Sequence, residues 1–520
     1  MKKLILSAIF AVFAPVSHNL ASCATLPPPL PPNVEQVLNA ITASELKGDL
    51  SFLASDTLQG RFTPSPGLEV AAEFIAAKFR AAGLEPGGDH DYFQTAEMVD
   101  RRLPTMATNL TLFSGDRALT APAAEITIDA TSAAAHLDHV PVVFLASKDP
   151  ALLKGSDLQG KAVVTAEADL AKLNGDDVRA ERRKARAFDQ AVAASGAVLN
   201  LTVVRNKRTF VVPPRLLFME QAAGNRAASL SVHSEELAKS VADANHPPAT
   251  LSVDIPAPID NKVVVKNVIG VLRGSDPVLS KTAVLLTAHY DHIGTVETAG
   301  QMTMHAAGDS PDRIYNGAND DGSGTVSVME IGHALAKLPH HPKRSIVFMT
   351  FFGEERGELG SQFYGKHPIF PIGQTVADVN LEQVGRTDST VGRQLNNASI
   401  TGFDYSDVTG YLIHAGERMG IKVYRDAEAS DAYFTRSDND ALAEQGVPAH
   451  TLCVAFDYPD YHGLGDEWPK VDYENMAKVD RMVALALLDI ANSEKAPEWN
   501  AQNPKTEHFR AARAVSQSAK

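Results

Sequence analysis

Short apolar runs alternate with amphipathic stretches along much of the chain, most regularly over residues 262–492. Residues 283–288 and 345–352 are almost wholly apolar, as buried strands are, whereas 473–491 shows apolar positions at helical spacing. Helical spacing also occurs over residues 68–84. Because apolar strands here alternate with amphipathic helices, the pattern predicts an α/β layer.

The pattern changes between residues 108 and 260, where short strand-like runs such as 140–145 dominate. This stretch predicts a β-rich domain inserted into the α/β domain, which would comprise residues 41–107 and 261–493. Residues 494–520 are polar and lack a clear apolar stripe, so we expect a mobile C-terminal tail.

Length and composition narrow the class of protein. A chain of 520 residues predicts two or three domains, and 44% hydrophobic with 21% charged residues is typical of globular proteins. The net charge of −15 disfavours nucleic acid as a partner. The basic run at 179–186 is interleaved with acids and alanines, as on a solvated helix face.

The N-terminus has the features of an export signal. Lysines at positions 2–3 precede the apolar run 4–16, which is too short to span a membrane. The sequence Leu-Ala-Ser-Cys ending at Cys23 resembles the lipobox of bacterial lipoproteins, so a lipid on Cys23 would attach the chain to a membrane. Ordinary cleavage just after Ala24 is the alternative. We therefore predict a signal peptide over residues 1–24, with a possible lipobox at Cys23.

Export predicts a periplasmic protein, an outer-membrane lipoprotein or a secreted protein. A Pro-rich linker, residues 25–40, would follow the signal peptide. Cys453 then remains in the folded part, so no intramolecular disulfide is expected there. Because Cys453 lies in an apolar run, we interpret it as a small core residue.

Histidine and carboxylate residues follow the ends of several expected strands. They are His289, Asp291, Asp320, Glu354, Glu355, Glu382 and His462. Each alone is a weak signal, but together they predict an active site at one edge of a sheet. Nitrogen and oxygen donors of this kind suit zinc, which indicates metal-assisted hydrolysis. Asp321 can cap the helix that follows, which leaves Asp320 as the candidate ligand.

Two pairs among these residues suggest distinct roles. Asp291, two residues after His289, can accept a hydrogen bond from its ring and so fix the tautomer of a metal ligand. The adjacent side chains of Glu354 and Glu355 diverge, so one can bind metal while the other reaches the attacking water. A carboxylate beside a second acid has a raised pKa, as a general base at neutral pH requires.

The ordered motifs resemble those of the co-catalytic zinc aminopeptidases, the family-28 metallopeptidases, which include glutamate carboxypeptidase. The motifs are His289-x-Asp291, Gly317-Ala-x-Asp320-Asp-Gly-Ser-Gly324, Phe352-Gly-Glu354-Glu355, Asn380-Leu-Glu382-x-Val-Gly-Arg386 and Tyr461-His462. The resemblance covers roughly residues 40–492. In addition, residues 156–165 resemble the first strand of a protease-associated domain, which many members carry as an insertion.

The resemblance implies a three-layer α/β/α domain with a mixed sheet and a protease-associated-like insert. It also implies two zinc ions per subunit, one held by His289, Asp320 and Glu382 and the other by Asp320, Glu355 and His462. Asp291 would orient His289, and Glu354 would be the general base. The expected activity is that of an exported zinc aminopeptidase acting on the N-termini of peptides.

Two departures from the family pattern concern the site. Position 382 is Glu where many relatives have Asp, which adds a methylene to one ligand. In Arg436-Ser-Asp438-Asn439 the histidine that often follows Ser-Asp is absent. We expect Asp438 and Asn439 to line the substrate site.

Alternative functions remain open at this point. The same metal scaffold serves carboxypeptidases, dipeptidases and glutaminyl cyclases. A carboxypeptidase needs a cation for the substrate carboxylate, and Arg386 and Arg436 are the nearest candidates. A non-catalytic binding module, in which the insert would be the functional part, is a further alternative, but it predicts missing metal ligands and none is missing.

Overall fold

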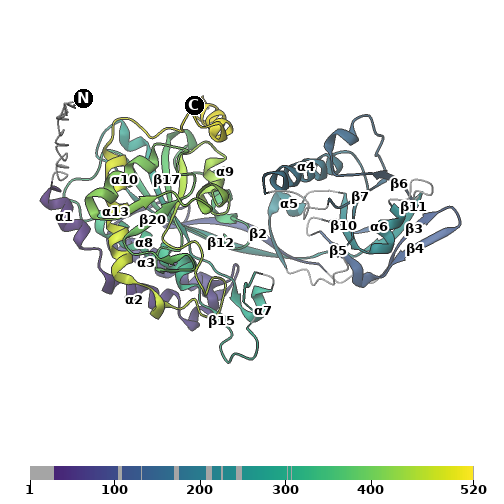
Figure 1. Cartoon of the computed structure of the whole chain (residues 1–520), viewed down its shortest axis with the longest axis horizontal. Coiled ribbons are helices and arrows are strands. Elements are labelled where there is room, and N and C mark those ends of the chain that lie inside the picture. Colours follow the sequence, from purple (N-terminus) through teal and green to yellow (C-terminus); the bar gives the residue numbers. More distant parts are fainter. Residues whose placement is uncertain are drawn as a thin grey trace, which may run out of the picture.

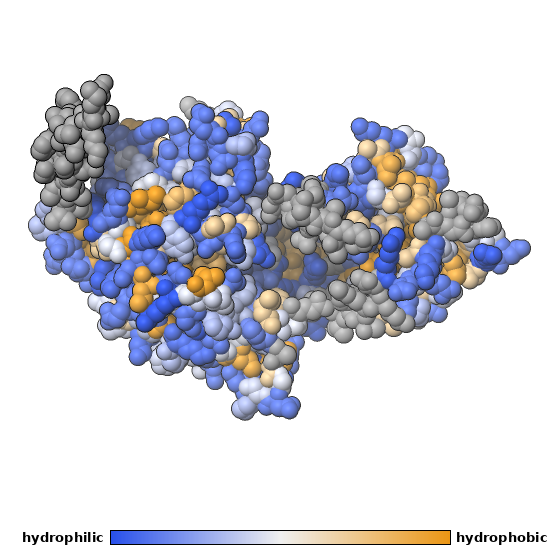
Figure 2. Space-filling model, viewed as in Figure 1, coloured by the Kyte–Doolittle hydropathy of each residue, from blue (hydrophilic) through white to orange (hydrophobic). Residues whose placement is uncertain are grey.

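The computed structural model describes residues 29–103, 108–129, 132–168, 175–205, 214–223, 227–241, 249–300, 302–305 and 307–518. The expected signal peptide and Cys23 lie outside these residues. Among the described helices, none combines the length and apolar character needed to cross a membrane. Hydrophilic residues cover most of the face shown in Figure 2, with apolar residues in small separate groups.

A large mixed sheet forms the centre of the first lobe (Figure 1). In spatial order its strands are β21 (Lys422–Tyr424), β20 (Asn397–Ile400), β22 (Ala449–Cys453), β17 (Thr375–Leu381), β13 (Ala283–His289), β16 (Ser345–Phe351), β12 (Ile259–Leu272), β2 (Phe93–Arg102) and β9 (Arg215–Phe218), and β1 (Glu85–Pro86) pairs with β12. Strands β22, β17, β13 and β16 run parallel, whereas β12 and β2 are antiparallel to their neighbours.

Both faces of this sheet are buried. In β13, Val284 and Leu286 belong to one hydrophobic cluster, while Leu285 between them belongs to another on the opposite face. The helices that supply the first cluster are α1 (Pro32–Asn39), α2 (Ala43–Leu53), α3 (Pro66–Ala82), α8 (Gly324–Leu335), α10 (Val408–Met419) and α13 (Tyr473–Asn492). Those on the other face are α9 (Leu359–Lys366), α12 (Asn439–Ala443) and α14 (Glu507–Ser518). The predicted three-layer α/β fold with a mixed sheet is therefore confirmed.

A second sheet builds the smaller lobe, between β2 and β12 in the sequence (Figure 1). Its strands, in spatial order, are β4 (Arg117–Ala121), β3 (Leu110–Ser114), β11 (Thr250–Ile255), β6 (Ala135–Leu145), β7 (Ala162–Ala166), β8 (Leu199–Val204), β10 (Ala228–His233) and β5 (Ile126–Ile128). Strands β6, β7, β8 and β10 are parallel, and α4 (Gly175–Ala194) and α6 (Glu235–Val241) accompany them. Strand β9 lies within the range predicted for the insert but pairs with β2 in the large sheet.

Two terminal segments are more ordered than the sequence suggested. Part of the expected Pro-rich linker forms helix α1 (Pro32–Asn39), which buries Val37 and Leu38. The expected mobile tail contains α14, whose Phe509 stacks on Trp499 with ring centroids 4.8 Å apart. Both predictions are wrong because a few well-placed apolar side chains suffice to pack a mostly polar segment.

The remaining elements are short. They are α5 (Met219–Ala223), α7 (Val296–Ala299), α11 (Ala429–Ala432), β14 (Gly294–Thr295), β15 (Ile314–Tyr315), β18 (Asp388–Ser389) and β19 (Gly392–Arg393). The connections around β14 and β15 carry a loop, residues 302–305, toward the carboxyl ends of the parallel strands.

Candidate metal centre

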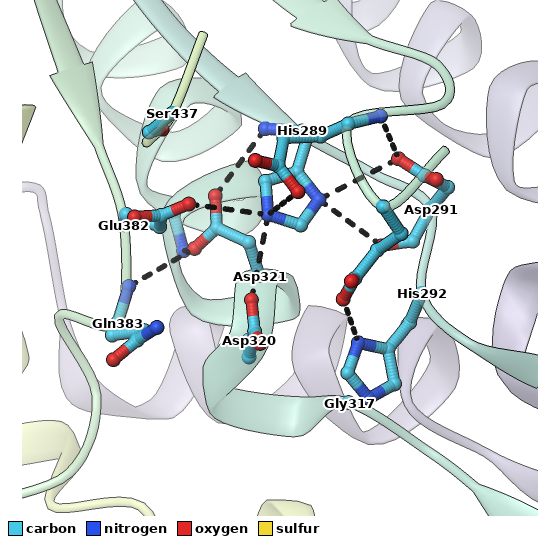
Figure 3. Close-up of polar contacts among 12 residues, drawn as sticks. His289, Asp291, His292, Gly317, Asp320, Asp321, Glu382, Gln383 and Ser437 are labelled. Atoms are coloured by element: carbon cyan, nitrogen blue, oxygen red, sulfur yellow. Dashed lines mark hydrogen bonds and ion pairs between the residues drawn. The ribbon is translucent and has the colours of Figure 1, made fainter. Parts of the chain in front are cut away.

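The predicted site residues meet at the carboxyl ends of the parallel strands. His289 is the last residue of β13, the pair Glu354 and Glu355 follows β16, and Glu382 follows β17. His462 comes from the loop after β22. Because these strands run parallel, their ends fall at one edge of the sheet, and side chains far apart in sequence come together there (Figure 3).

Asp320 stands between the two histidines. Its Oδ1 lies 3.4 Å from His289 Nε2, and its Oδ2 lies 3.1 Å from His462 Nε2. Glu382 Oε1 is 3.5 Å from His289 Nε2, and Glu355 Oε1 is 3.2 Å from His462 Nε2. Each oxygen of Asp320 therefore faces a separate group of donors.

The donor set fits zinc. Tetrahedral zinc at 2.0–2.1 Å from its ligands would place neighbouring donor atoms about 3.3–3.4 Å apart, close to the separations just given. His289 Nε2 and Glu355 Oε1 are buried and make no hydrogen bond of suitable geometry within the described residues. Buried atoms of this kind are stable when a cation lies between them.

His292 joins the second group of donors and was missed in the sequence. Its Nδ1 lies 2.8 Å from Glu355 Oε1, and the residue is fully buried. Donor atoms of His292, Asp320, Glu355 and His462 all lie within 4.8 Å of one another. The signal was available, since His292 directly follows the His-x-Asp motif.

Asp291 connects a candidate ligand to the candidate base. His289 Nδ1, the ring nitrogen that faces away from the metal centre, lies 3.2 Å from the Asp291 backbone carbonyl oxygen and 3.5 Å from Asp291 Oδ1. Asp291 Oδ1 also accepts a hydrogen bond from the Glu354 backbone N–H at 3.1 Å. Thr63 Oγ1 donates to the other oxygen, at 3.1 Å. Asp291 thus orients His289 mainly through its carbonyl oxygen and fixes the backbone that carries Glu354 through its carboxylate.

The loop 302–305 fixes His462. The ring Nδ1 of His462 lies 2.6 Å from the Met302 carbonyl oxygen, which leaves Nε2 for the metal centre. Thr303 Oγ1 and the Met304 backbone N–H both donate to the His462 carbonyl oxygen. Because His462 lies several residues beyond the end of β22, this loop rather than the strand orients its side chain.

Two buried charged residues support the segment that carries Asp320, and neither was recognised in the sequence as functional. Asp466 accepts hydrogen bonds from the backbone N–H groups of Asn319 and Asp320, at 3.0 and 3.1 Å. Arg61 donates to the carbonyl oxygens of Asn316 and Gly317, at 2.7 and 2.9 Å. Both residues act through contacts with main-chain atoms that are far away in the sequence, so their roles could not be read from the residues around them.

Asp321 acts as a cap, as expected. Its Oδ1 accepts hydrogen bonds from the backbone N–H of Gly324, the first residue of α8, at 3.0 Å, and of Gln383, at 3.2 Å. Its Oδ2 accepts from the His289 backbone N–H at 3.3 Å. The peptide bond between Asp320 and Asp321 is cis. Asp321 therefore ties together three of the segments that carry the donors.

Electrostatics sets Glu354 apart from its neighbour. Burial raises the pKa of Glu354 well above its ordinary value, and the carboxylates of Glu382 and Glu355 raise it further against the attraction of His289. Burial also raises the pKa of Glu355, but the attraction of His462 outweighs it, so the net pKa of Glu355 is lowered to about 2. The two adjacent acids thus have opposite protonation preferences.

A cavity of about 560 Å³ opens onto these residues. Its walls include Asp320, Glu354, Glu355, Glu382 and His462, together with Met302, Met304, Tyr433, Arg436, Thr451, Phe456 and Tyr461. Asp438 and Asn439 do not line it. They are fully buried behind the wall, where Asn439 Oδ1 accepts a hydrogen bond from Thr451 Oγ1 at 2.8 Å, so the expectation that they line the substrate site is wrong.

Residues 267–487, which carry every donor described above, match the family model described as peptidase family M28. The matched residues make up less than half of the chain, and over them the chain is similar to peptidase family M28. The match confirms, over these residues, the resemblance inferred from the motifs.

Individual relatives agree with the family. The chain is 31% identical over 138 residues to a probable zinc metalloprotease of Pyrenophora teres f. teres, covering 25% of each protein. It is 36% identical over 97 residues to a vacuolar membrane protease of Pyricularia oryzae, covering 19% of this chain and 9% of that protein. The chain thus spans a quarter or less of the length of these curated relatives.

Among solved structures, the aminopeptidase from Aneurinibacillus sp. strain AM-1 is similar over 90% of this chain and 97% of its own, with a TM-score of 0.55 and 18% sequence identity. The likeness shows that the two chains share a fold across both lobes.

Proposed function

We propose that the protein is a zinc-dependent aminopeptidase that removes N-terminal residues from peptides. The observation that carries the proposal is the position of Asp320, with one oxygen toward His289 and the other toward His462. A carboxylate in this position can bridge two metal ions, and two-metal sites are suited to hydrolysis.

The site would hold two zinc ions. His289, Asp320 and Glu382 would bind one ion, and Asp320, Glu355 and His462 would bind the other. Bound zinc would polarise the substrate carbonyl and lower the pKa of the attacking water. Glu382 reaches the His289 group at 3.5 Å, so the methylene that it adds relative to Asp is accommodated.

Glu354 would be the general base. It lines the cavity, and its carboxylate Oε2 lies 3.9 Å from His289 Nε2, beside the donors rather than among them. The Glu354 carboxylate would accept a proton from the attacking water and then deliver it to the leaving amine. Asp291 would act as a positioning residue, because it holds both His289 and the Glu354 backbone.

The decisive test is hydrolysis of aminoacyl p-nitroanilides with free and blocked N-termini, with and without a chelator. Cleavage of the free substrates alone, lost on chelation and restored by zinc, supports an aminopeptidase. Cleavage only of N-blocked peptides with a free C-terminus would instead establish a carboxypeptidase. No cleavage by the zinc-loaded protein would contradict a broad aminopeptidase and direct attention to cyclase chemistry.

Export is proposed from the N-terminal sequence. The basic start, the short apolar run and the lipobox-like sequence ending at Cys23 support cleavage and transfer out of the cytoplasm, with membrane attachment through a lipid on Cys23 as one outcome. Mass spectrometry of the mature N-terminus distinguishes a lipidated Cys23 from cleavage just after Ala24. A retained Met1 would overturn export by this signal.

A further inference from the structure

Arg436 is the feature of the cavity that the proposed chemistry leaves unused. Among the residues described as lining it, Arg436 is the only arginine or lysine. Five carboxylates line the same cavity, namely Asp320, Glu354, Glu355, Glu382 and Asp457. A cation on a wall that is otherwise acidic stands out as a recognition element, because it can attract a group that the carboxylates would repel.

Arg386, the other candidate cation suggested by the sequence, already forms ion pairs within the protein. The guanidinium of Arg386 donates to Asp388 Oδ1 at 2.7 Å and to Asp460 Oδ2 at 3.0 Å, and the residue is buried. The pKa of Arg386 is raised, because these hydrogen bonds outweigh the opposing effect of burial. Arg386 is therefore a structural residue that holds its loop and is not free to bind a substrate.

Arg436 differs from Arg386 both in burial and in its ion pairs. It is exposed, and its guanidinium carbon lies 4.8 Å from the centre of the Tyr433 ring. Within the described residues, no carboxylate comes within 4.0 Å of its side-chain nitrogens. The cation–π contact with this ring and an interaction with the Tyr433 hydroxyl support the guanidinium, and its remaining N–H groups are available to a ligand.

The wall that carries Arg436 is fixed on the Glu382 side of the site. The next residue, Ser437, accepts a hydrogen bond from Asn380 Nδ2 at 2.8 Å, and Asn380 lies on β17 two residues before Glu382. Tyr433 meets Phe456 edge-on, with ring centroids 5.3 Å apart. The guanidinium is thus supported by an anchored turn and an aromatic pair.

We propose, building on the aminopeptidase function, that Arg436 binds a carboxylate of the substrate and that the enzyme therefore prefers substrates that carry one near the scissile bond. The carboxylate has two possible sources: an acidic N-terminal side chain, or the free C-terminus of a dipeptide. Arginine and carboxylate form bidentate, charge-assisted hydrogen bonds, which are stronger than those between neutral groups.

The test uses substrate pairs that differ only by carboxylate against amide. Aspartyl and asparaginyl p-nitroanilide form the first pair, and Leu-Gly and its C-terminal amide form the second. We expect the wild-type protein to favour the carboxylate of one pair by about tenfold or more in kcat/KM. The pair that shows the preference identifies the source of the carboxylate.

The variants assign the preference to Arg436. Arg436→Gln should abolish the preference while hydrolysis of the amide partner stays within about twofold, and Arg436→Lys should keep only part of it, because lysine lacks the bidentate fork. Arg393→Gln, an exposed arginine of β19 outside this cavity, is the matched control and should retain the preference. The proposal is overturned if neither wild-type pair shows a preference or if Arg436→Gln leaves it intact.

Failure of the aminopeptidase function has a separate readout, the hydrolysis of leucyl p-nitroanilide, which carries no carboxylate. If the wild-type protein hydrolyses neither this nor any other substrate of the panel, that function fails. Arg436 is then judged by calorimetric titration of the zinc-loaded protein with Leu-Gly and with its amide. Tighter binding of Leu-Gly that Arg436→Gln removes supports the proposal. Equal binding of Leu-Gly and its amide excludes the C-terminal source, and equal binding of aspartyl and asparaginyl p-nitroanilide in the same titration then overturns the proposal.

Discussion

His292 Nδ1 and Glu355 Oε1 lie 2.8 Å apart at the buried end of the metal centre. The His292 ring also meets the His462 ring edge-on, with centroids 5.4 Å apart. Behind it, a Cβ atom on Gly317 would come within 2.4 Å of the His292 ring, so only glycine leaves room for the imidazole. The chain therefore places a second histidine beside the group formed by Asp320, Glu355 and His462.

Replacing His292 by alanine should weaken the binding of one metal ion more than the other. Partners that contact or orient a ligand typically change metal affinity by about 10–100-fold, and His292 contacts only the Glu355 group. Calorimetric zinc titration and metal content after dialysis would show one weakened site. The visible spectrum of the cobalt-substituted protein would show whether His292 binds the metal directly.

His340→Ala is the control for this change, because His340 is exposed and precedes β16, at the opposite end of that strand from Glu354 and Glu355. It should bind two equivalents of zinc like the wild-type protein. Unchanged stoichiometry and affinity in His292→Ala would contradict a role for His292 in the metal centre.

Glu354→Gln should lower kcat by about 10²–10⁴-fold, the usual contribution of general acid–base catalysis. Glutamine keeps the shape of the side chain but cannot accept the proton from water. Because Glu354 lies beside the donors, metal content should stay at the wild-type level, which separates loss of the base from loss of a ligand. An active Glu354→Gln protein would assign the base elsewhere.

Removal of the metal should lower both activity and stability. Asp320, Glu355 and Glu382 converge with Glu354 in a buried space, and without cations their negative charges repel. Ligands that bind only the folded state stabilise it, by about 2.7 kcal/mol at a hundred times the dissociation constant. Thermal unfolding with and without chelator should show a reversible fall in Tm, whereas an unchanged Tm would argue against a metal centre here.

The sequence predicted the site better than its supporting residues, for a physical reason. His289, Glu355 and Glu382 each stand at or just beyond the end of an apolar strand, so the apolar runs mark them as candidates. Their assignment as metal ligands came from the resemblance to the family. The roles of Arg61 and Asp466 depend on contacts with main-chain atoms more than a hundred residues away in the sequence. Such contacts arise from tertiary folding and leave no local pattern.

The fold shows the same division between local and tertiary signals. The layers around β13 and β16 follow from apolar runs buried on both faces. The C-terminal helix is instead held by the ring of Phe509 and by hydrogen bonds from Arg513 to the carbonyl oxygens of Ile372 and Thr375. Phe509 packs on Trp499 and on Phe434, which belongs to a different part of the chain. Composition alone does not distinguish a mostly polar segment that buries one aromatic ring, such as α14, from a mobile C-terminal tail.

Phe509→Ala should therefore destabilise the C-terminal segment. Truncation of a buried phenylalanine typically costs about 3–5 kcal/mol, and Phe509 is only 3% exposed. Hydrogen exchange should become faster over residues 494–518 while zinc content is unchanged. Val515→Ala, at a position that is 69% exposed, serves as the control. Equal protection in both variants would mean that the segment is not held by this contact.

Asp480 on α13 makes the stability of the protein depend on pH, at a site away from the metal centre. Burial raises the pKa of Asp480 from 3.8 to about 8, and Glu330 adds to the shift while the Ser327 hydroxyl opposes it. Between about pH 4 and pH 8, Asp480 is therefore protonated in the folded state and ionised in the unfolded state. Stability must fall with rising pH across this window, because the unfolded state binds fewer protons.

Asp480→Asn removes this dependence, because the amide cannot ionise. The free energy of unfolding of the variant minus that of the wild-type protein should rise by roughly 2–4 kcal/mol between pH 5 and pH 8, at about 1.4 kcal/mol per pH unit. Because both proteins carry the same metal centre, the pH dependence of metal binding cancels in the difference. Glu417→Gln, an exposed acid on α10, should give a difference that does not vary with pH. A difference for Asp480→Asn that is equally flat would show that Asp480 is ionised in the folded protein, with a neutralising partner or water beside it.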